Sequence, residues 1–498
     1  MSCKPGKLHI RHWAAEVTDF HGLKHVAGNY GGAFRRIVWL LLFLLALGYC
    51  TYQCALVIIT YRSHSHVTKI DVEYETEVSF PAITVCNFNK YRESAFTEDD
   101  IKNVGVHLGI IDEDHDLIYP NLYTDEFRDF LDNVNWTAVE EDSDYNMTEF
   151  TTRTGHQIED VVVSCDWDDQ ECEEGALTSV LTHLGNCFTF NAQTDESDKE
   201  NWFVSKSAGA ANGLRLVLDL ETPEYTPSND LDGGASDAGF RVMLHYPTEP
   251  PYPKELGFSV APGMHTTVAM RYEHITSLAP PFSTCEDEGA DIITHFDHYS
   301  LQACRIECET QVVLAECGCR LPEQPGDEEV CGPAETHECA HSTLRQFIAG
   351  TLDTDETCEC KSPCIFENYP FTATQSKLRS SFLEKLYSNS SNNFTTEYID
   401  NNIAIISFYY EALNYETIEM LPEYTLPTLL AVIGGNMGLF LGASALTVVQ
   451  FGEYIVDEIS GWCVCGKKKN NAKVNGETAK VEPVQTVSAK DAWSDGNV

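Results

Sequence analysis

The sequence predicts a membrane protein in which two transmembrane helices flank a large, disulfide-rich α+β extracellular domain. Two runs, 37–61 and 424–452, contain no Asp, Glu, Lys or Arg, and each exceeds the roughly 20 residues with which a helix crosses a bilayer. Fourteen of the chain's 19 cysteines lie between these runs. An even number of cysteines in an exported segment favours disulfides, and seven are expected here.

Positive charges indicate the orientation of the two runs. Arg35 and Arg36 precede the first run and Lys467–Lys469 follow the second, so the positive-inside bias places both termini in the cytoplasm. The first run follows a polar, charged segment without a small-residue cleavage site, which favours a retained signal anchor over a removable signal peptide. We therefore expect a multi-pass protein of the plasma membrane. Its extracellular part carries N-glycosylation sequons at Asn135, Asn146, Asn389 and Asn393.

The two apolar runs divide the chain into five parts. They also imply that the lipid bilayer is a partner of this chain. Ten cysteines fall between Cys285 and Cys364, so this region should be a rigid, helical and disulfide-stapled part of the extracellular domain. The parts are a cytoplasmic N-terminus (1–36), a first transmembrane helix (37–61), the extracellular domain (62–423), a second transmembrane helix (424–456) and a cytoplasmic tail (457–498).

The charge of the chain is concentrated outside the membrane. The net charge is −45, and the two terminal segments carry about +4 and 0, which leaves −49 for the residues between them. Most of these carboxylates are expected only to keep the surface soluble. Such an exterior nevertheless repels nucleic acids and ATP and concentrates cations, so we expect no nucleic-acid partner.

No motif of catalysis or of metal binding is present in the sequence. It lacks a nucleophile elbow, an HExxH motif and a Walker loop, and its CGC and CEC spacings are not the CxxC pairs of a structural zinc site. We therefore expect no enzyme, no catalytic residue, no bound metal and no cofactor.

The extracellular segment contains both strand and helix patterns. Apolar and polar residues alternate in 214–221 and 239–246, and 403–420 is a long strand pattern that leads almost directly into the second apolar run. The stretch SLQACRIECETQVVL is helical, with Ser300 as its expected N-cap. Its buried face is expected to hold Leu301, Cys304, Cys308 and Val312, and its polar face Gln302, Glu307, Glu309 and Thr310.

The second apolar run is unusually rich in glycine. In GGNMGLFLGAS, Gly434, Gly438 and Gly442 recur every four residues, a pattern that lets helix backbones approach closely. A static packing face is one explanation. As one helix, however, the 29 uncharged residues would be about 43 Å long, longer than the ~30 Å hydrocarbon core. The segment must therefore tilt or break.

The chain resembles the degenerin/epithelial sodium channel family, and most closely the acid-sensing ion channels, from about His21 to Glu458. The motifs are FHGLKH before the first run, HVTKID and FPAITVCN after it, LGFSVAPG, YSLQACRIECET, EALNYETIE, and GLFLGAS in the second run. The resemblance implies a sodium-selective, amiloride-sensitive channel opened by extracellular protons. It also implies a homotrimer, or a heterotrimer with related subunits.

The resemblance further implies the pairing of the cysteines. The expected disulfides are Cys86–Cys187, Cys165–Cys172, Cys285–Cys364, Cys304–Cys360, Cys308–Cys358, Cys317–Cys339 and Cys319–Cys331.

By the same resemblance, the second span breaks at Gly442, Ala443 and Ser444, where an extended belt lines the pore. Backbone carbonyls of this belt would act as ion ligands, and Gly438 lies one helical turn before it. Irregular backbone at membrane depth is tolerated where it lines a water-filled path. Small side chains are therefore what a constriction needs.

Other positions match gating elements of the family or depart from its outer pore. His21 and Gly22 match a His-Gly pair below the pore, and Leu413 and Asn414 match a linker that changes arrangement during desensitisation. Ala431 and Val432 stand where the relatives carry a glycine and an aspartate. Because an acidic ring at a pore mouth attracts cations, we expect altered conduction and altered modulation by extracellular Ca²⁺.

The acid sensor of the family is changed in this chain. In the pocket where relatives pair carboxylates, Asp232 has Arg345 as its partner position and Gly233 has His341. A related pair has become Arg215 and Ser407. Two close carboxylates sense acid because their repulsion raises a pKa, and an arginine partner has the opposite effect. A family histidine is Ser65 here. The remaining sensor candidates are Glu411, Glu416, Asp71, Glu73, His64, His66 and His341.

Two functions within one family therefore remain open. One is a channel gated by protons. The other is a channel that is constitutively open, or opened by a peptide or other small ligand, with protons only modulating it. An ATP-gated trimer would need lysines for polyphosphate, which the acidic exterior does not favour. A non-conducting adhesion domain would leave GGNMGLFLGAS unexplained.

Overall fold

The structure, a computed structural model, describes residues 13–14, 20–28, 32–136, 145–193, 202–227, 237–286, 293–352, 360–387, 394–444 and 446–456. Two compact units are present. One comprises the chain up to Ser65 together with the chain from Glu423 onward, and the other is His66–Pro422.

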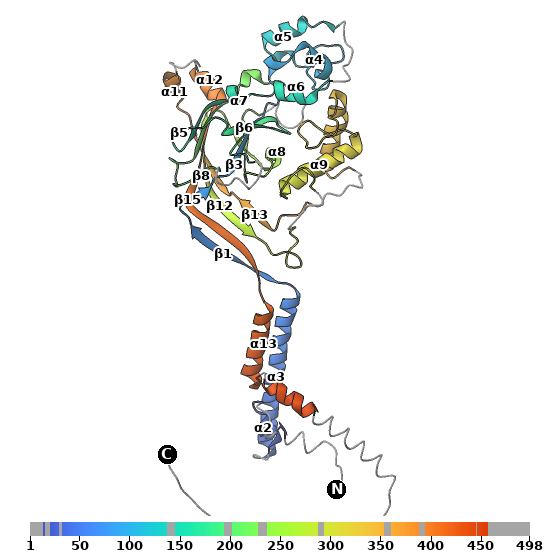
Figure 1. Cartoon of the computed structure of the whole chain (residues 1–498), viewed down its shortest axis with the longest axis vertical. Helices are drawn as coiled ribbons and strands as arrows, with labels where there is room; N and C mark the ends of the chain where they lie inside the picture. The colour runs from blue at the N-terminus through green and yellow to red at the C-terminus, as the bar shows by residue number, and fades with distance from the viewer. Residues whose placement is uncertain are drawn as a thin grey trace, which may run out of the picture. The chain divides into compact units, whose positions relative to one another are not determined.

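The first unit contains two apolar helices that pack side by side (Figure 1). Helix α3 (Ala33–Arg62) extends beyond the apolar run to the arginines at both of its ends. Helix α13 (Leu426–Leu441) starts where the hydroxyl of Thr425 accepts a hydrogen bond from the amide of Thr428, at 3.3 Å. Their contact buries Cys50 against Leu441. A short helix, α2 (Leu23–Ala27), precedes α3.

Helix α3 is long and apolar enough to cross a membrane. Helix α13 meets this requirement only together with the next helix, Leu446–Val456, and the two are bent by 78° at the break between them. The second apolar run is therefore not one straight helix. Leu41 and Leu45 on α3 are exposed, which suits a helix surrounded by lipid.

The second unit is built on two main sheets. The larger has the order β13-β12-β15-β9-β4-β5, with β1 added to β15 and β14 added to β12. Strand β15 is its centre, because β9, β12 and β1 all pair with it. The strands of this sheet are β1 (His66–Tyr74), β4 (Val162–Trp167), β5 (Gln170–Glu171), β9 (Leu214–Asp219), β12 (Met264–Thr276), β13 (Ile365–Asn368), β14 (Phe371–Lys377) and β15 (Ile403–Pro422).

The smaller sheet has five strands in the order β11-β10-β3-β7-β6, and β2 and β8 form a separate pair. These strands are β2 (Val78–Ser79), β3 (Ala82–Asn87), β6 (Leu177–Thr182), β7 (Gly185–Phe190), β8 (Val204–Ser205), β10 (Phe240–His245) and β11 (Phe258–Val260).

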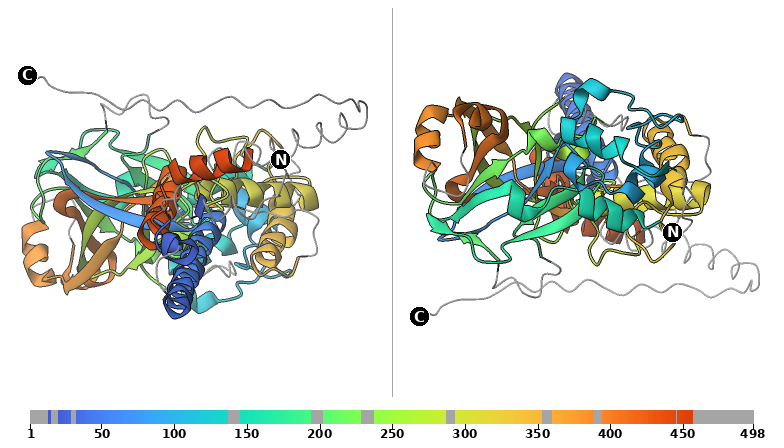
Figure 2. Two further views of the ribbon diagram at one scale, coloured as in Figure 1. Left: turned by 90° about the horizontal axis from the view of Figure 1, so that it is seen from below. Right: turned by 90° about the horizontal axis from the view of Figure 1, so that it is seen from above.

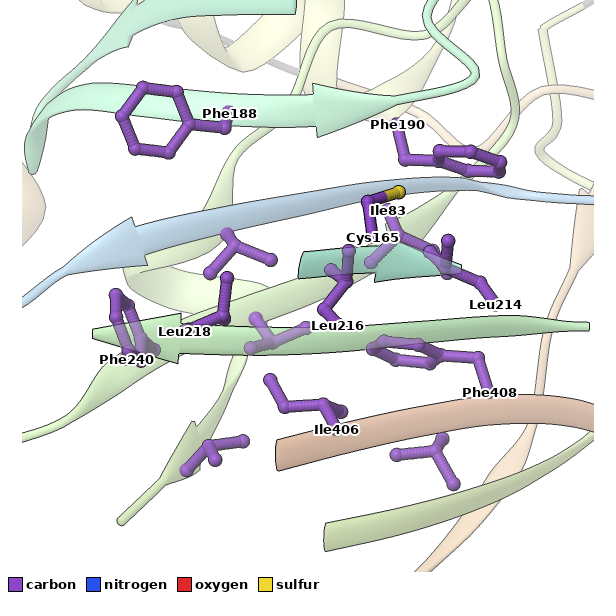
Figure 3. Packing of buried hydrophobic residues seen from close by; sticks show 14 of the residues in the cluster. Ile83, Cys165, Phe188, Phe190, Leu214, Leu216, Leu218, Phe240, Ile406 and Phe408 are labelled. Carbon is purple, nitrogen blue, oxygen red and sulfur yellow. The ribbon is translucent and has the colours of Figure 1, made fainter. Parts of the chain in front are cut away.

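The main core lies between the two sheets (Figure 3). Leu214, Leu216 and Leu218 of β9 point into it, as the predicted alternation requires. Val217, on the other face of β9, is also buried, in a second cluster with Ile399. The face of β9 that carries Val217 is therefore not simply a solvent-exposed face, because helices pack over Val217. The covering helices are α11 (Ser380–Tyr387) and α12 (Thr396–Asn402).

Two further helical regions surround the sheets. One region is a cluster around Phe150. The other is formed by the cysteine-rich segment and lies on the opposite side of the unit from α11 and α12 (Figures 1 and 2). The hydroxyl of Ser300 caps α9 by accepting from the amide of Ala303, at 3.0 Å, as predicted. The helices are α4 (Glu98–Val104), α5 (Asp125–Asp132), α6 (Met147–Thr154), α7 (Ile158–Val161), α8 (Pro253–Leu256), α9 (Leu301–Cys317), the π-helix η7 (Glu335–Ala340) and α10 (His341–Ile348).

Disulfides hold this unit together, and those observed coincide with pairs that the family resemblance implies. Cys308 is also disulfide-bonded, but its expected partner Cys358 lies outside the described residues. The observed disulfides are Cys86–Cys187, Cys165–Cys172, Cys285–Cys364, Cys304–Cys360, Cys317–Cys339 and Cys319–Cys331.

The prediction that Glu307, Glu309 and Thr310 lie on the polar face of α9 is wrong. Glu307 is only 1% exposed and Glu309 only 5%. Other elements bring partners to them: His295 lies 3.0 Å from Glu307, and the hydroxyl of Tyr252 donates to Glu309. Buried carboxylates are tolerated when they are hydrogen-bonded in this way. These partners come from outside the helix, so helical spacing cannot predict them.

Candidate pore and gating sites

The break in the second apolar run has a defined local structure. Gly442 ends α13 in the left-handed region, with φ of 67°, a conformation that glycine adopts without the penalty of a Cβ. Ser444 then begins the next helix. Its amide donates to the hydroxyl of Thr447 at 3.1 Å, and its own hydroxyl accepts from the amide of Thr447 at 3.4 Å. A left-handed glycine and a reciprocal Ser-Thr cap therefore hold the break.

The break leaves two backbone carbonyls available. Within the part of the chain that the structure describes, no donor reaches the carbonyl oxygens of Gly442 and Ala443. The carbonyl of Ser444 differs, because it accepts from the amides of Thr447 and Val448. Free carbonyl oxygens are suitable ligands for a hard cation such as Na⁺. Of the three belt residues, Gly442 and Ala443 therefore offer such ligands.

The His21-Gly22 pair lies directly beside this break. The amide of His21 donates to the carbonyl of Leu441 at 2.7 Å, and a Cβ added to Gly442 would collide with the imidazole of His21. Gly22 has φ of 83° and starts α2. The ring of His25, on α2, stacks on Trp39 of α3 with centroids 4.5 Å apart. The structure thus brings together the two segments that the sequence singled out separately.

One face of α13 is bare in the single chain. Ala431, Gly434, Gly435 and Gly438 are exposed and share one helical face. A Cβ on Gly434 or Gly435 would meet nothing within 4 Å. Val432, one residue further round, is half-buried. This face is free to approach other helices closely.

In the second unit, strand β15 contains a large bulge. Tyr410 pairs with Met270 of β12 and Tyr415 pairs with Tyr272, so Glu411–Asn414 stand opposite Arg271 alone. On the other edge of β15, the carbonyl of Leu413 accepts from the amide of Glu75 at 3.2 Å. In chain order, Asn414 is the first residue of β15 that pairs with β1. Extra residues bend a strand and interrupt its ladder. Leu413 and Asn414 therefore lie where β15 can change its register most easily.

Two of the acidic sensor candidates lie on the opposite face of β15 from Glu416. Glu416 pairs with Val72 of β1 and has Arg271 Nη1 at 4.0 Å. Asp71 and Glu73 alternate with Val72, so their side chains point to the other face. Asp71 pairs with Lys69 there, and Glu73 accepts from the hydroxyl of Tyr415 at 2.8 Å.

Strand β1 therefore lies beside β15, but Asp71 and Glu73 point to the other face from Glu416, because side chains alternate along a strand. Glu411 is exposed in the bulge.

The altered positions Arg215 and Ser407 are neighbours in the larger sheet, and their chemistry is not that of two acids. Arg215 of β9 stands directly opposite Ser407 of β15. Arg215 Nη1 lies 3.3 Å from Asp166, and His265 Nε2 lies 2.9 Å from the hydroxyl of Ser407. Burial and the charge of Arg215 lower the pKa of His265. No carboxylate pair can form here.

The other altered positions are described only in part. Asp232 and Gly233 fall outside the described residues. Arg345 Nε donates to the carbonyl of His341 at 3.3 Å, and the ring of His341 meets that of His337 edge-on at 5.1 Å. His64 has a positive φ of 53°, and His66 begins β1 opposite Pro422.

Two of the four glycosylation candidates can be placed. Asn135 and Asn146 are exposed, and Asn389 and Asn393 are outside the described residues. Asn146 Oδ1 caps α6 by accepting from the amides of Thr148 and Glu149. This cap leaves its Nδ2 free for a glycan.

A buried ion cluster was missed by sequence reasoning. His183 Nε2 lies 3.0 Å from Glu309 and its Nδ1 lies 3.1 Å from Glu323. Burial alone would lower the pKa of His183, but the hydrogen bonds to both carboxylates raise it to about 9. Burial would likewise raise the pKa of Glu323, but Lys90 and His183 lower it to about 2.

His183 and Glu323 therefore keep their charges across the mildly acidic range, and their ion pair clamps the β6–β7 turn to the cysteine-rich helical region. No sequence pattern links positions so far apart.

In the described part of the chain, no three His, Cys, Asp or Glu side chains are arranged to hold a metal ion.

Comparison with known proteins assigns the family. A family model described as amiloride-sensitive sodium channel matches residues 14–454. Acid-sensing ion channel 1C of Danio rerio is 34% identical over 461 residues, covering 92% of this chain and 84% of that protein. Acid-sensing ion channel 2 of Homo sapiens is 33% identical over 467 residues, covering 92% and 88%. The chain therefore belongs to the amiloride-sensitive sodium channel family, whose members are ion channels and not enzymes.

A third relative is similar, and one solved structure is distant. Acid-sensing ion channel 1 of Gallus gallus is 34% identical over 468 residues, covering 93% of this chain and 86% of that protein. A structure of a proton-activated chloride channel is 7% identical, covers 86% of this chain and 96% of that chain, and has a TM-score of 0.31. It supports no inference about this chain.

The contact between His21 and Gly442 predicts a pair of compensating substitutions. Gly442→Ala should lower the melting temperature of the purified full-length protein, because its Cβ collides with the imidazole and the left-handed backbone costs roughly 1 kcal/mol. Adding His21→Ala should restore part of the loss by vacating that space. Gly318→Ala is the matched control, since Gly318 also follows a helix with a positive φ (73°) but nothing lies within 4 Å of an added Cβ. Equal effects of Gly442→Ala and Gly318→Ala would contradict the contact.

Proposed function

We propose that this chain is the subunit of a trimeric, sodium-selective cation channel of the plasma membrane that extracellular protons open and amiloride blocks. The observation that carries the proposal is the break at Gly442–Ser444. It presents two carbonyls that no donor among the described residues reaches, beside His21 and Gly22, in a chain that belongs to a sodium channel family. Helix α3 and the bent α13 pair would both span the bilayer, with both termini in the cytoplasm.

A single chain cannot complete such a pore. Two carbonyl oxygens are too few to replace the hydration shell of an ion, so several copies must contribute to one ring. The bare face of α13 at Ala431, Gly434 and Gly438 suits close approach between copies. Three copies, as the family resemblance implies, would supply six carbonyls. A homotrimer and a heterotrimer with related subunits would both use this bare face.

Proton gating rests on the relatives, which are named acid-sensing ion channels, and on the acidic groups around the bulge of β15. In this proposal Glu411 and Glu416, with Asp71, Glu73, His64, His66 and His341 as further candidates, bind protons outside. The bulge at Leu413 and Asn414 then changes arrangement and controls desensitisation. Extracellular Ca²⁺ would modulate the channel by competing for the same carboxylates, and no cofactor is required.

A second candidate is a channel of the same family that is constitutively open, or opened by a peptide or other small ligand, with protons only modulating it. The cluster of Arg215, Asp166, His265 and Ser407 favours this candidate, because a carboxylate pair that could sense acid is replaced there.

A pH step separates these possibilities. Cells expressing the full chain would be recorded under voltage clamp while extracellular pH falls from about 7.4 to about 5. An inward sodium current that acid evokes and amiloride blocks supports the first candidate. An amiloride-sensitive current that is present at every pH supports the second. Silence despite surface expression would refute the first candidate and the constitutively open form of the second, and peptides would then be applied to test the ligand-opened form.

Selectivity should depend on the size of the belt side chains. Ser444→Leu should reduce the preference for sodium over potassium or abolish the current, because added volume displaces the neighbouring carbonyls of Gly442 and Ala443. Ser444→Ala is the control: it removes the helix cap, worth about 1 kcal/mol, without adding volume. Reversal potentials in sodium and potassium solutions measure the effect. An unchanged reversal potential and conductance in Ser444→Leu would show that this segment does not line the pore.

Proton activation should depend on the carboxylates beside the bulge. Neutralising Glu411 and Glu416 together, as Glu411→Gln with Glu416→Gln, should move half-activation to more acidic pH or abolish it, because two proton-binding groups are lost. Asp232→Asn should change it little, since Arg345 at its partner position would keep that carboxylate ionised. Concentration-response curves for protons provide the measurement. A large shift from Asp232→Asn, with none from the double variant, would place the sensor in the altered pocket.

A further inference from the structure

A cavity of about 430 Å³ lies beside helix α5, in the helical region that also holds α4 and α6 (Figure 1). Small-molecule sites commonly have volumes of roughly 300–1,000 Å³. The walls of the cavity come from three segments that are far apart in the sequence. They are the 3₁₀-helix η2 (Glu93–Ala95) with the residue that follows it, α5 with its N-cap, and the 3₁₀-helix η6 (Thr222–Glu224).

Three carboxylates line the cavity, those of Glu93, Glu126 and Glu224. Glu224 Oε2 accepts from the amide of Ser94 at 2.9 Å, and Glu126 is exposed on α5. Among the described residues, no lysine, arginine or histidine forms an ion pair with any of the three. The cavity therefore carries uncompensated negative charge. The arginines of this region pair with other carboxylates, in the ion pairs Arg92–Asp160, Arg128–Asp125 and Arg153–Asp100.

The carboxylate of Glu93 is an independent sign of a ligand. Glu93 lines the cavity although it is only 3% exposed. Its Oε1 accepts from the hydroxyl of Thr124 and, at 3.1 Å, from the amide of Thr124. No donor among the described residues reaches its Oε2. Because a buried charge costs free energy unless it is paired, this oxygen is available to a donor from outside the chain.

The electrostatic setting of Glu93 also favours a cation. Burial raises the pKa of Glu93, and the charges of Glu224 and Glu126 raise it further, against the hydrogen bonds from Thr124. A positive charge in the cavity would offset both the burial and the repulsion.

Much of the remaining wall is aromatic, formed by Phe96, Phe127 and Phe130. The ring centroid of Phe127 lies 6.1 Å from that of Phe96 and 5.8 Å from that of Phe130, so the three rings form one continuous apolar surface. Phe96 and Phe127 are buried, and Phe130 is half-buried. Phenyl rings pack against apolar groups, and their faces also attract cations.

This combination of walls favours an organic cation over a metal ion. A hard metal ion takes several oxygen ligands at once, and no three His, Cys, Asp or Glu side chains in the described ranges are arranged for one. Phenyl rings offer no such ligands. An ammonium group attached to an apolar body, in contrast, uses the carboxylates and the rings together.

We propose that this cavity binds a small organic cation in which an ammonium group is joined by a short chain to an aromatic body. The ammonium group donates to Glu93 Oε2 and is attracted by Glu224, while the aromatic body packs on Phe127 and Phe130. The exposed carboxylate of Glu126 draws the cation towards the cavity. The site goes beyond the proposed function, because binding here requires neither proton gating nor an open pore.

The probe for this site is 2-phenylethylamine, which carries a phenyl ring and a primary ammonium group. Its binding to the purified full-length protein would be measured by isothermal titration calorimetry at neutral pH. We expect saturable binding with a dissociation constant below about 1 mM. The uncharged analogue 2-phenylethanol and the ringless analogue ethylamine should each bind at least about tenfold more weakly, because each can use only one of the two surfaces.

Substitutions in the cavity should weaken this binding. Glu93→Gln keeps the size and an acceptor for Thr124 but removes the charge, so it should raise the dissociation constant of 2-phenylethylamine at least about tenfold. Glu224→Gln repeats this charge test should Glu93→Gln lower the melting temperature of the free protein. Phe130→Ala should reduce the preference for 2-phenylethylamine over ethylamine. Asp129→Asn removes a charge at an exposed position of α5 that does not line the cavity, so it is the matched control and should leave the dissociation constant unchanged.

Three results would overturn the site: no saturable binding of 2-phenylethylamine, equal affinities for 2-phenylethylamine and 2-phenylethanol, or equal losses in Asp129→Asn and in the two glutamine variants. Failure of the proposed function gives a different pattern. A channel that the pH step does not open refutes proton activation, and the calorimetry still decides whether the cavity binds the amine.

Discussion

Strand β15 is the element on which the rest of the extracellular unit depends. Its first half is buried and pairs with β9 and β12, and its second half pairs with β1 and β12 as it continues towards Pro422. Between the halves, Glu411–Asn414 have no one-to-one partners on β12. A strand held on both edges transmits displacement along its length, and a bulge is where its ladder can change most easily. Helix α13 begins at Leu426, four residues after Pro422, so only a short connection joins β15 to α13 in the chain.

Two groups of buried ions in this unit behave differently because their partners differ. His183 stands between Glu309 and Glu323, with Lys90 acting on Glu323, and opposite charges favour the ionised forms of His183 and Glu323. Glu93 has other carboxylates, Glu224 and Glu126, as its charged neighbours, and both burial and repulsion disfavour its ionised form. The first arrangement keeps the helical region attached to the sheets throughout mild acidification. The second leaves negative charge that a cation from outside the chain can neutralise.

The break that ends α13 also has one local and one distant cause. Gly442 permits the left-handed turn, and Ser444 with Thr447 starts the next helix, so these local features are readable from the sequence. The position of His21 is a distant cause. Its amide binds the last carbonyl of α13, and its ring occupies the space next to Gly442. A side chain at position 442 would therefore disturb both the turn and the packing.

The sequence by itself determined the elements whose signals are local: the apolar runs, the Ser300 cap, the strand of 403–420, the small-residue break and the glycosylation sequons. The family motifs added the cysteine pairs, of which those between described residues are present. Only the tertiary structure decided which charges meet. It placed Glu307 and Glu309 in the interior against His295 and His183, and put Asp71 and Glu73 on the opposite face of the sheet from Glu416. The physical reason is that periodicity reports how a side chain points from its own element. The partner that makes burial of a charge tolerable comes from another element, at a distance in sequence that no local pattern records.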